Sequence, residues 1–144
     1  MHGDDLTAFA HALGFSKIRI VAYSSGAHAA LVAVTYPDMV VSLAPNEPPA
    51  LGILNGLPNT ADMLKAWAAK FTPAREAFKV GDVQRGIPLF VDGVGGLGAY
   101  DRRAETEKKM SLDNVAPFQA DAITNRPRPA FTCDIAKRSR LPRS

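Results

Sequence analysis

The sequence is poor in several features that would place it in a specialised class. It has one cysteine, Cys133, which can form neither an internal disulfide nor a multi-cysteine zinc site, so a disulfide-held secreted scaffold is excluded and a cytoplasmic location is expected. The start of the chain, with Asp4 and Asp5, lacks the basic and apolar stretches of a signal peptide. The longest stretch without a formal charge, residues 20–37, contains serines and a histidine and is too short and too polar for a membrane span. We therefore expect neither a targeting segment nor a membrane partner.

Basic residues are too unevenly placed to predict a nucleic-acid-binding surface. The net charge is +3, and the excess gathers near the C-terminus at Lys137, Arg138, Arg140 and Arg143, where no aromatic residue is interleaved for base stacking. We expect no nucleic-acid partner. With 144 residues, 47% of them hydrophobic and 22% charged, the chain has a globular composition and room for little more than one domain.

Apolar periodicity predicts alternating helices and strands at the start of the chain. Residues 5–13 repeat apolar side chains at helical spacing, and residues 17–22 form a short run rich in β-branched residues. Small apolar residues over 26–36 predict a buried helix, and 39–43 is a second run of strand length. This alternation is typical of an α/β fold with parallel strands joined by a right-handed crossover.

The pattern changes after a connection rich in proline and glycine over residues 45–58. Beyond it the sequence predicts a separate layer of helices, at residues 60–71, 73–78, 83–91 and 103–123. Pro117 should kink or split the last of these, because proline removes a backbone donor and crowds the preceding turn. The proline-containing end of the chain is expected to be extended, with 130–133 as its strand-like piece.

The most informative residues surround Ser24, which follows the first predicted strand and leads directly into the small-residue helix. This is the pattern of a nucleophile elbow, a sharp turn that lifts a serine hydroxyl above the edge of a sheet. The N–H of the next residue, Ser25, and the helix N-terminus would then face a developing oxyanion. Small side chains at Ala22 and Gly26 should let strand and helix pass closely.

At these residues the chain resembles the α/β-hydrolase family. The resemblance extends from Asp4-Asp5-Leu6 through the elbow and the Tyr36-Pro37-Asp38 helix stop to Glu47-Pro48, followed by helices like the family's cap. It implies a partial α/β-hydrolase fold with few parallel strands, flanking helices and a helical cap. It also implies a small-molecule substrate whose ester, amide or related bond is attacked by Ser24, with the Ser25 backbone as oxyanion donor and with no cofactor or metal. The corresponding parts are a hydrolase core over 1–55, a cap over 56–128 and an extended basic tail over 129–144, the start of a missing strand.

The chain departs from the family pattern at the general base. The family places its histidine after the acid, near the C-terminus, whereas the histidines here are His2, His11 and His28. His28 follows Ser24 by four residues on the same predicted helix, and we interpret it as a structural side chain. Glu47 matches an acid position used by some members, although a loop carboxylate is the simpler interpretation. We therefore expect an internal piece of a hydrolase, catalytically incomplete, whose exposed sheet edges need a second copy or a complementing chain.

Two other functions stay open from the sequence. Gly93, Gly95 and Gly98 fit the spelling G-x-G-x-x-G, and Asp113 lies at the distance of a ribose-binding acid, as in a dinucleotide-binding oxidoreductase. That fingerprint needs a strand before it and a close-packed helix after it. The other alternative is a non-enzymatic hydrolase-like domain that binds a ligand or partner, which would share the fold and lack the triad.

Overall fold

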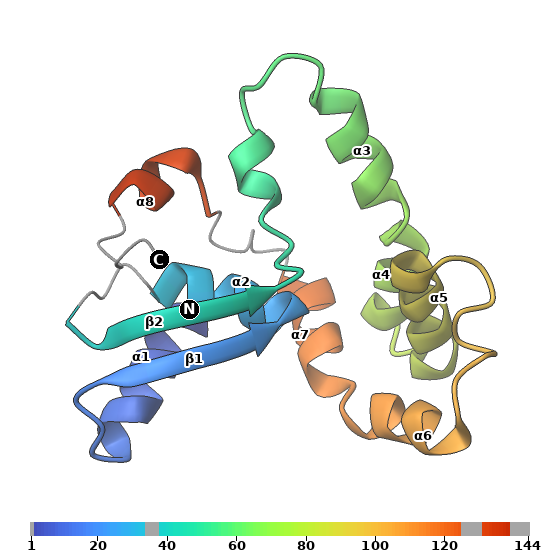
Figure 1. Cartoon of the computed structure of the whole chain (residues 1–144). Coiled ribbons are helices and arrows are strands. Elements are labelled where there is room, and N and C mark those ends of the chain that lie inside the picture. The colour runs from blue at the N-terminus through green and yellow to red at the C-terminus, as the bar shows by residue number, and fades with distance from the viewer. Residues whose placement is uncertain (1, 34–37, 125–130, 139–144) are drawn as a thin grey trace. The chain divides into compact units, whose positions relative to one another are not determined.

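The computed structural model describes residues 2–33, 38–124 and 131–138 and shows a mixed α/β chain (Figure 1). It divides into two compact units. The first, called here the sheet unit, comprises Met1–Leu57 and Arg128–Ser144, and the second, the helical unit, comprises Pro58–Pro127.

The sheet unit is built around two parallel strands. In chain order its elements are α1 (His2–Ala12), β1 (Ile18–Tyr23), α2 (Ser24–Ala33), β2 (Val40–Asn46), the 3₁₀ helix η1 (Leu51–Leu54) and α8 (Cys133–Arg138). Fully buried alanines of α2, at Ala27, Ala30 and Ala33, recur on one face of the helix. Because alanine has the smallest apolar side chain, this face lets α2 pack closely in its unit.

One face of the sheet is packed and the other is open. Ile18 and Ile20 of β1 pack with Val40 and Leu43 of β2 in a core that also includes Leu6, Leu31 and Phe131. The alternate residues of β1 point the other way, and there Val21 is 88% exposed and Tyr23 62% exposed. Parallel sheets normally have both faces covered, so this open face is unusual for its class.

The helical unit packs its helices around one apolar core. Its elements are α3 (Ala61–Ala69), α4 (Thr72–Lys79), α5 (Val83–Gly95), α6 (Glu105–Asp113) and α7 (Ala116–Thr124). Phe78 of α4 and Ile87 of α5 are almost fully buried at its centre. None of the helices in the described part of the chain is long and apolar enough to cross a membrane.

A run of aromatic rings extends through the helical unit. Neighbouring ring centroids lie 4.7 Å apart for Trp67 and Phe71, 5.6 Å for Phe71 and Phe90, 4.7 Å for Phe90 and Phe118, and 5.9 Å for Phe118 and Phe78. Three of the pairs are tilted and the Phe78–Phe118 pair is stacked, and both arrangements are favourable for aromatic rings. Phe78, Phe90 and Phe118 belong to the core of this unit, whereas Trp67 at the other end of the run is exposed.

The split expected from Pro117 is confirmed, and one predicted strand is longer in the structure. The helix predicted over 103–123 is divided into α6 and α7, and Pro117 is the second residue of α7, where its missing N–H costs no helical hydrogen bond. The second strand runs to Asn46 and includes Pro45, which is tolerated because β2 has one strand neighbour in the described sheet. The predicted end of the helix over 26–36 lies outside the described residues.

The extended tail predicted over 129–144 is wrong for its middle part, which forms helix α8. The Thr132 side chain accepts a hydrogen bond from the Ile135 N–H at 3.3 Å, as an N-cap does, and Ile135 packs against the core of the sheet unit. Burial of Ile135 and the cap together favour a helix over an extended chain. Residues 129–130 and 139–144 of the predicted tail lie outside the described ranges.

Candidate active site

The strand that carries Ser24 turns into a helix without an intervening loop. β1 ends at Tyr23 and α2 begins at Ser24, whose φ is 51°. This left-handed conformation costs a residue with a Cβ about 1–2 kcal/mol, and such strained residues are concentrated at functional sites. The sharp turn on which the elbow interpretation depends is therefore present at the carboxyl end of β1.

The first turn of α2 provides backbone donors without a competing carboxylate. It contains Ser24, Ser25 and Gly26 and no acidic residue, so the N–H groups of the helix start are not shared with an acid of their own turn. Ser25 is exposed. Such a helix start can stabilise an oxygen that gains negative charge during attack on a carbonyl group.

Close passage of strand and helix does not depend on Gly26, in contrast to the prediction. A Cβ built on Gly26 would have no neighbour within 4 Å, and the glycine lacks a positive φ. The tight packing of α2 occurs instead at its buried alanines, beginning with Ala27. Sequence spacing identified the turn correctly but assigned its steric requirement to the wrong residue.

Glu47 lies at the same edge of the sheet as Ser24. Tyr23 and Asn46 are the last residues of β1 and β2 and are partners in the parallel register. Ser24 and Glu47 are therefore the first residues after the two strand ends. Glu47 is exposed and also has a positive φ, of 48°. Two strained non-glycine residues therefore follow the carboxyl ends of the two strands.

Tyr23 joins this site, although sequence reasoning did not identify it. Its hydroxyl is hydrogen-bonded to the Glu47 carboxylate, and this bond, with the negative charge of Glu47, raises the pKa of Tyr23 above its usual value. The phenol, which is protonated at neutral pH in any tyrosine of ordinary pKa, donates to the carboxylate. The predicted strands, 17–22 and 39–43, include neither residue, so this contact follows only from the observed register, in which Tyr23 lies opposite Asn46.

The sequence places the histidines away from the two strand ends. His28 is half-buried one helical turn beyond Ser24, on α2. His11 is exposed in the last turn of α1, which leads to the opposite end of β1. His2 opens α1, and its side chain lies outside the described set. Neither described histidine directly follows a strand end as Ser24 and Glu47 do, so the strand register assigns no histidine base to Ser24.

The glycine-rich segment in the helical unit has a structural role. Gly93 and Gly95 lie inside α5, so the segment follows a helix and not the strand that a dinucleotide fingerprint requires. The Asp92 carboxylate accepts hydrogen bonds from the N–H groups of Tyr100 at 2.8 Å and Gly98 at 3.1 Å, and these bonds lower the pKa of Asp92. The backbone N–H groups that could have bound a phosphate therefore already donate hydrogen bonds to the Asp92 carboxylate.

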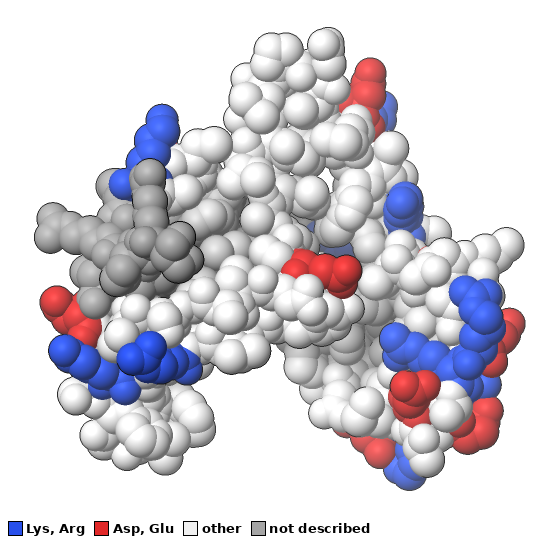
Figure 2. Space-filling model, viewed as in Figure 1, with Lys and Arg blue, Asp and Glu red and all other residues white. Residues whose placement is uncertain are grey.

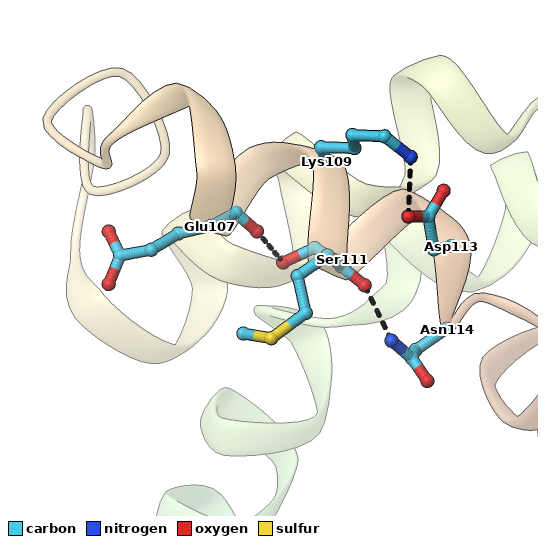
Figure 3. Close-up of polar contacts among 6 residues, drawn as sticks. Glu107, Lys109, Ser111, Asp113 and Asn114 are labelled. Carbon is cyan, nitrogen blue, oxygen red and sulfur yellow. Dashed lines mark hydrogen bonds and ion pairs between the residues drawn. The ribbon is translucent and has the colours of Figure 1, made fainter.

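The polar residues of α6 are used within that helix (Figure 3). The Lys109 ammonium lies 2.6 Å from the Asp113 carboxylate, and the Ser111 hydroxyl donates to the Glu107 carbonyl at 2.9 Å. The Asn114 side chain donates to a carbonyl of the last turn. These local bonds satisfy the helix and its C-terminal end and assemble no catalytic group.

Among the described residues, no three His, Cys, Asp or Glu side chains are grouped closely enough to hold a metal ion. Comparison of the chain with models of protein families, with curated proteins and with solved structures gives no match. The functional argument therefore depends on the geometry at the carboxyl edge of the sheet.

Proposed function

We propose that the chain is an α/β-hydrolase-like protein in which Ser24 is the nucleophile that attacks ester, amide or related bonds of a small-molecule substrate. The observation that carries the proposal is the left-handed Ser24 between the last residue of β1 and the first turn of α2. In this arrangement the serine hydroxyl and the Ser25 N–H serve the same carbonyl group. The sheet unit then corresponds to part of a hydrolase core and the helical unit to a cap.

Two separate tasks are needed for attack by Ser24: backbone N–H groups stabilise the oxyanion, and a base removes the proton of the hydroxyl. Without a base a serine hydroxyl is barely nucleophilic at neutral pH, whereas a thiolate attacks without one. We therefore expect the wild-type chain to turn over esters poorly as long as no base is supplied from outside the described residues. Replacement of the hydroxyl by a thiol tests the geometry separately from the base.

The experiment uses Ser24→Cys in a Cys133→Ser background, so that a single thiol is present. The thiolate attacks the carbonyl carbon of p-nitrophenyl acetate, p-nitrophenolate leaves, and a thioester forms that mass spectrometry detects as an acetyl group on the chain. Ser16→Cys in the same background is the control, because Ser16 is exposed in the turn before β1. We expect Ser24→Cys to acylate at least tenfold faster, since its oxyanion is stabilised. Equal rates for the two variants would contradict the proposal.

A non-enzymatic ligand-binding role is the second candidate, and it is favoured because neither strand end of the described sheet is followed directly by a histidine. The same experiment separates the two functions. Fast acylation of Ser24→Cys supports a nucleophile site, whereas a rate equal to that of Ser16→Cys supports a binding domain that shares the fold alone.

A further inference from the structure

We propose that Tyr23 and Glu47 form a subsite for a cationic group beside Ser24, so that the site takes esters or amides that carry an ammonium group close to the scissile carbonyl. The inference rests on the proposed function of Ser24 and adds the substrate class. It starts from the side chains that the parallel register brings to one edge of the sheet.

The parallel register sets which residues meet at the edge of the sheet. Tyr23 and Asn46 are paired about one strand spacing apart, ~4.8 Å, and Ser24 and Glu47 directly follow them. The N-terminus of α2 therefore offers donors to an oxygen that becomes negative at the same edge at which the chain places Glu47. A substrate that complements both has a positive group within a few bonds of its reacting carbonyl.

The charge of the Tyr23–Glu47 pair is negative and unbalanced. A tyrosine is neutral at neutral pH, and contact with Glu47 raises the pKa of Tyr23 further, so the pair carries the single negative charge of the carboxylate. No lysine or arginine in the described part of the chain forms an ion pair with Glu47. Figure 2 shows basic side chains on the side of the sheet unit where the strands begin. Lys17 and Arg19 lie at the start of β1, whereas Glu47 follows the end of β2.

The ring of Tyr23 adds a second means of binding a cation. Tyr23 is 62% exposed on the open face of the sheet and is held by its hydrogen bond to Glu47. The face of an aromatic ring attracts a cation within about 6 Å of its centroid, so a quaternary or primary ammonium could contact ring and carboxylate together. A neutral or anionic substrate gains neither interaction.

The experiment measures the local potential with charged thiol reagents on Ser24→Cys in the Cys133→Ser background. The thiolate attacks the sulfenyl sulfur of a methanethiosulfonate, a disulfide forms, and methanesulfinate leaves. Rates are compared for the trimethylammonioethyl and the sulfonatoethyl reagents at low salt. We expect Glu47→Gln to lower the ratio of cationic to anionic rates about tenfold, as one charge at this spacing predicts in a water-exposed site, and added salt to reduce the difference.

Three controls define the outcome. Tyr23→Phe keeps the ring but frees the carboxylate, and it should lower the ratio less than Glu47→Gln does. Ser16→Cys should show no change of ratio on Glu47→Gln. If Glu47→Gln leaves the ratio of cationic to anionic rates at Ser24→Cys unchanged, the cation subsite alone is overturned. If p-nitrophenyl acetate acylates Ser24→Cys slowly, the proposed nucleophile is overturned and the subsite with it.

Discussion

The strained backbone at Ser24 predicts an unusual stability difference between two variants that both remove its hydroxyl. Ser24→Ala keeps a Cβ at a φ of 51°, whereas Ser24→Gly removes it. Relief of the left-handed conformation is worth about 1–2 kcal/mol, and glycine loses about 0.4–1 kcal/mol through the greater freedom of the unfolded chain. Ser24→Gly should therefore be more stable than Ser24→Ala by about 0.8 kcal/mol, and by at most about 1.6 kcal/mol.

The neighbouring residue supplies a matched control within the same helix. Ser25 has no positive φ, so at that position glycine should be less stable than alanine by up to about 1 kcal/mol, the usual helix preference. The sign of the difference therefore reverses between two adjacent serines. A reversal of this kind would identify Ser24 as the strained position.

The assay must report on the sheet unit. Trp67 is the single tryptophan and lies in the helical unit, so its fluorescence would follow the other unit. Amide hydrogen exchange of β1 under increasing urea gives the free energy of opening of the strand that carries the elbow. If Ser24→Gly is no more stable than Ser24→Ala in this assay, the left-handed turn and the elbow argument built on it are refuted.

The remaining predictions concern packing, pH and exposure of the strand edge. Gly86→Ala should destabilise the helical unit by about 1–3 kcal/mol in urea unfolding, because the added Cβ would overlap the buried ring of Phe78. This loss should occur despite the better helix propensity of alanine. A second substitution, Phe78→Leu, should reduce the destabilisation caused by Gly86→Ala. Gly26→Ala, which meets open space, should be neutral or up to about 1 kcal/mol stabilising. Folding lowers the pKa of Asp92, so the stability that its carboxylate contributes is complete above pH 3.8 and is lost as pH falls through the folded pKa. The stability of Asp92→Asn should therefore depend less steeply on pH over that interval in acid unfolding. An unchanged dependence would contradict the role of the backbone hydrogen bonds to Asp92. Amides of β1 that face away from β2 should exchange faster than those that face it, unless a second copy or another chain covers the edge.

Local features of the sequence predicted most of the secondary structure. The β-branched run before Ser24 and the small residues after it specified a strand followed by a helix, and Pro117 marked the division between α6 and α7. These features depend on residues close together in the chain, where side-chain periodicity and proline geometry act directly.

The features that the sequence did not predict depend on contacts between residues far apart in the chain or on the hydrogen bond of a single helix-capping side chain. The bond between Tyr23 and Glu47 requires the parallel register of two strands, and helix α8 depends on the Thr132 cap and on burial of Ile135. The glycine-rich segment after Asp92 matched a phosphate-binding spelling, although its donors serve that carboxylate. Periodicity in one segment contains no information on these tertiary partners.

The central claim is that Ser24 presents its hydroxyl to a reacting group at the edge of the sheet. The most direct measurement is peptide mass spectrometry of the wild-type chain after reaction with a fluorophosphonate over a range of increasing pH, which compensates for a missing base. The account predicts slow labelling that increases with pH, with the adduct on Ser24 and none on Ser25, and loss of labelling in Ser24→Ala. An adduct on Ser25, or labelling that is spread over exposed serines and unchanged in Ser24→Ala, would contradict it.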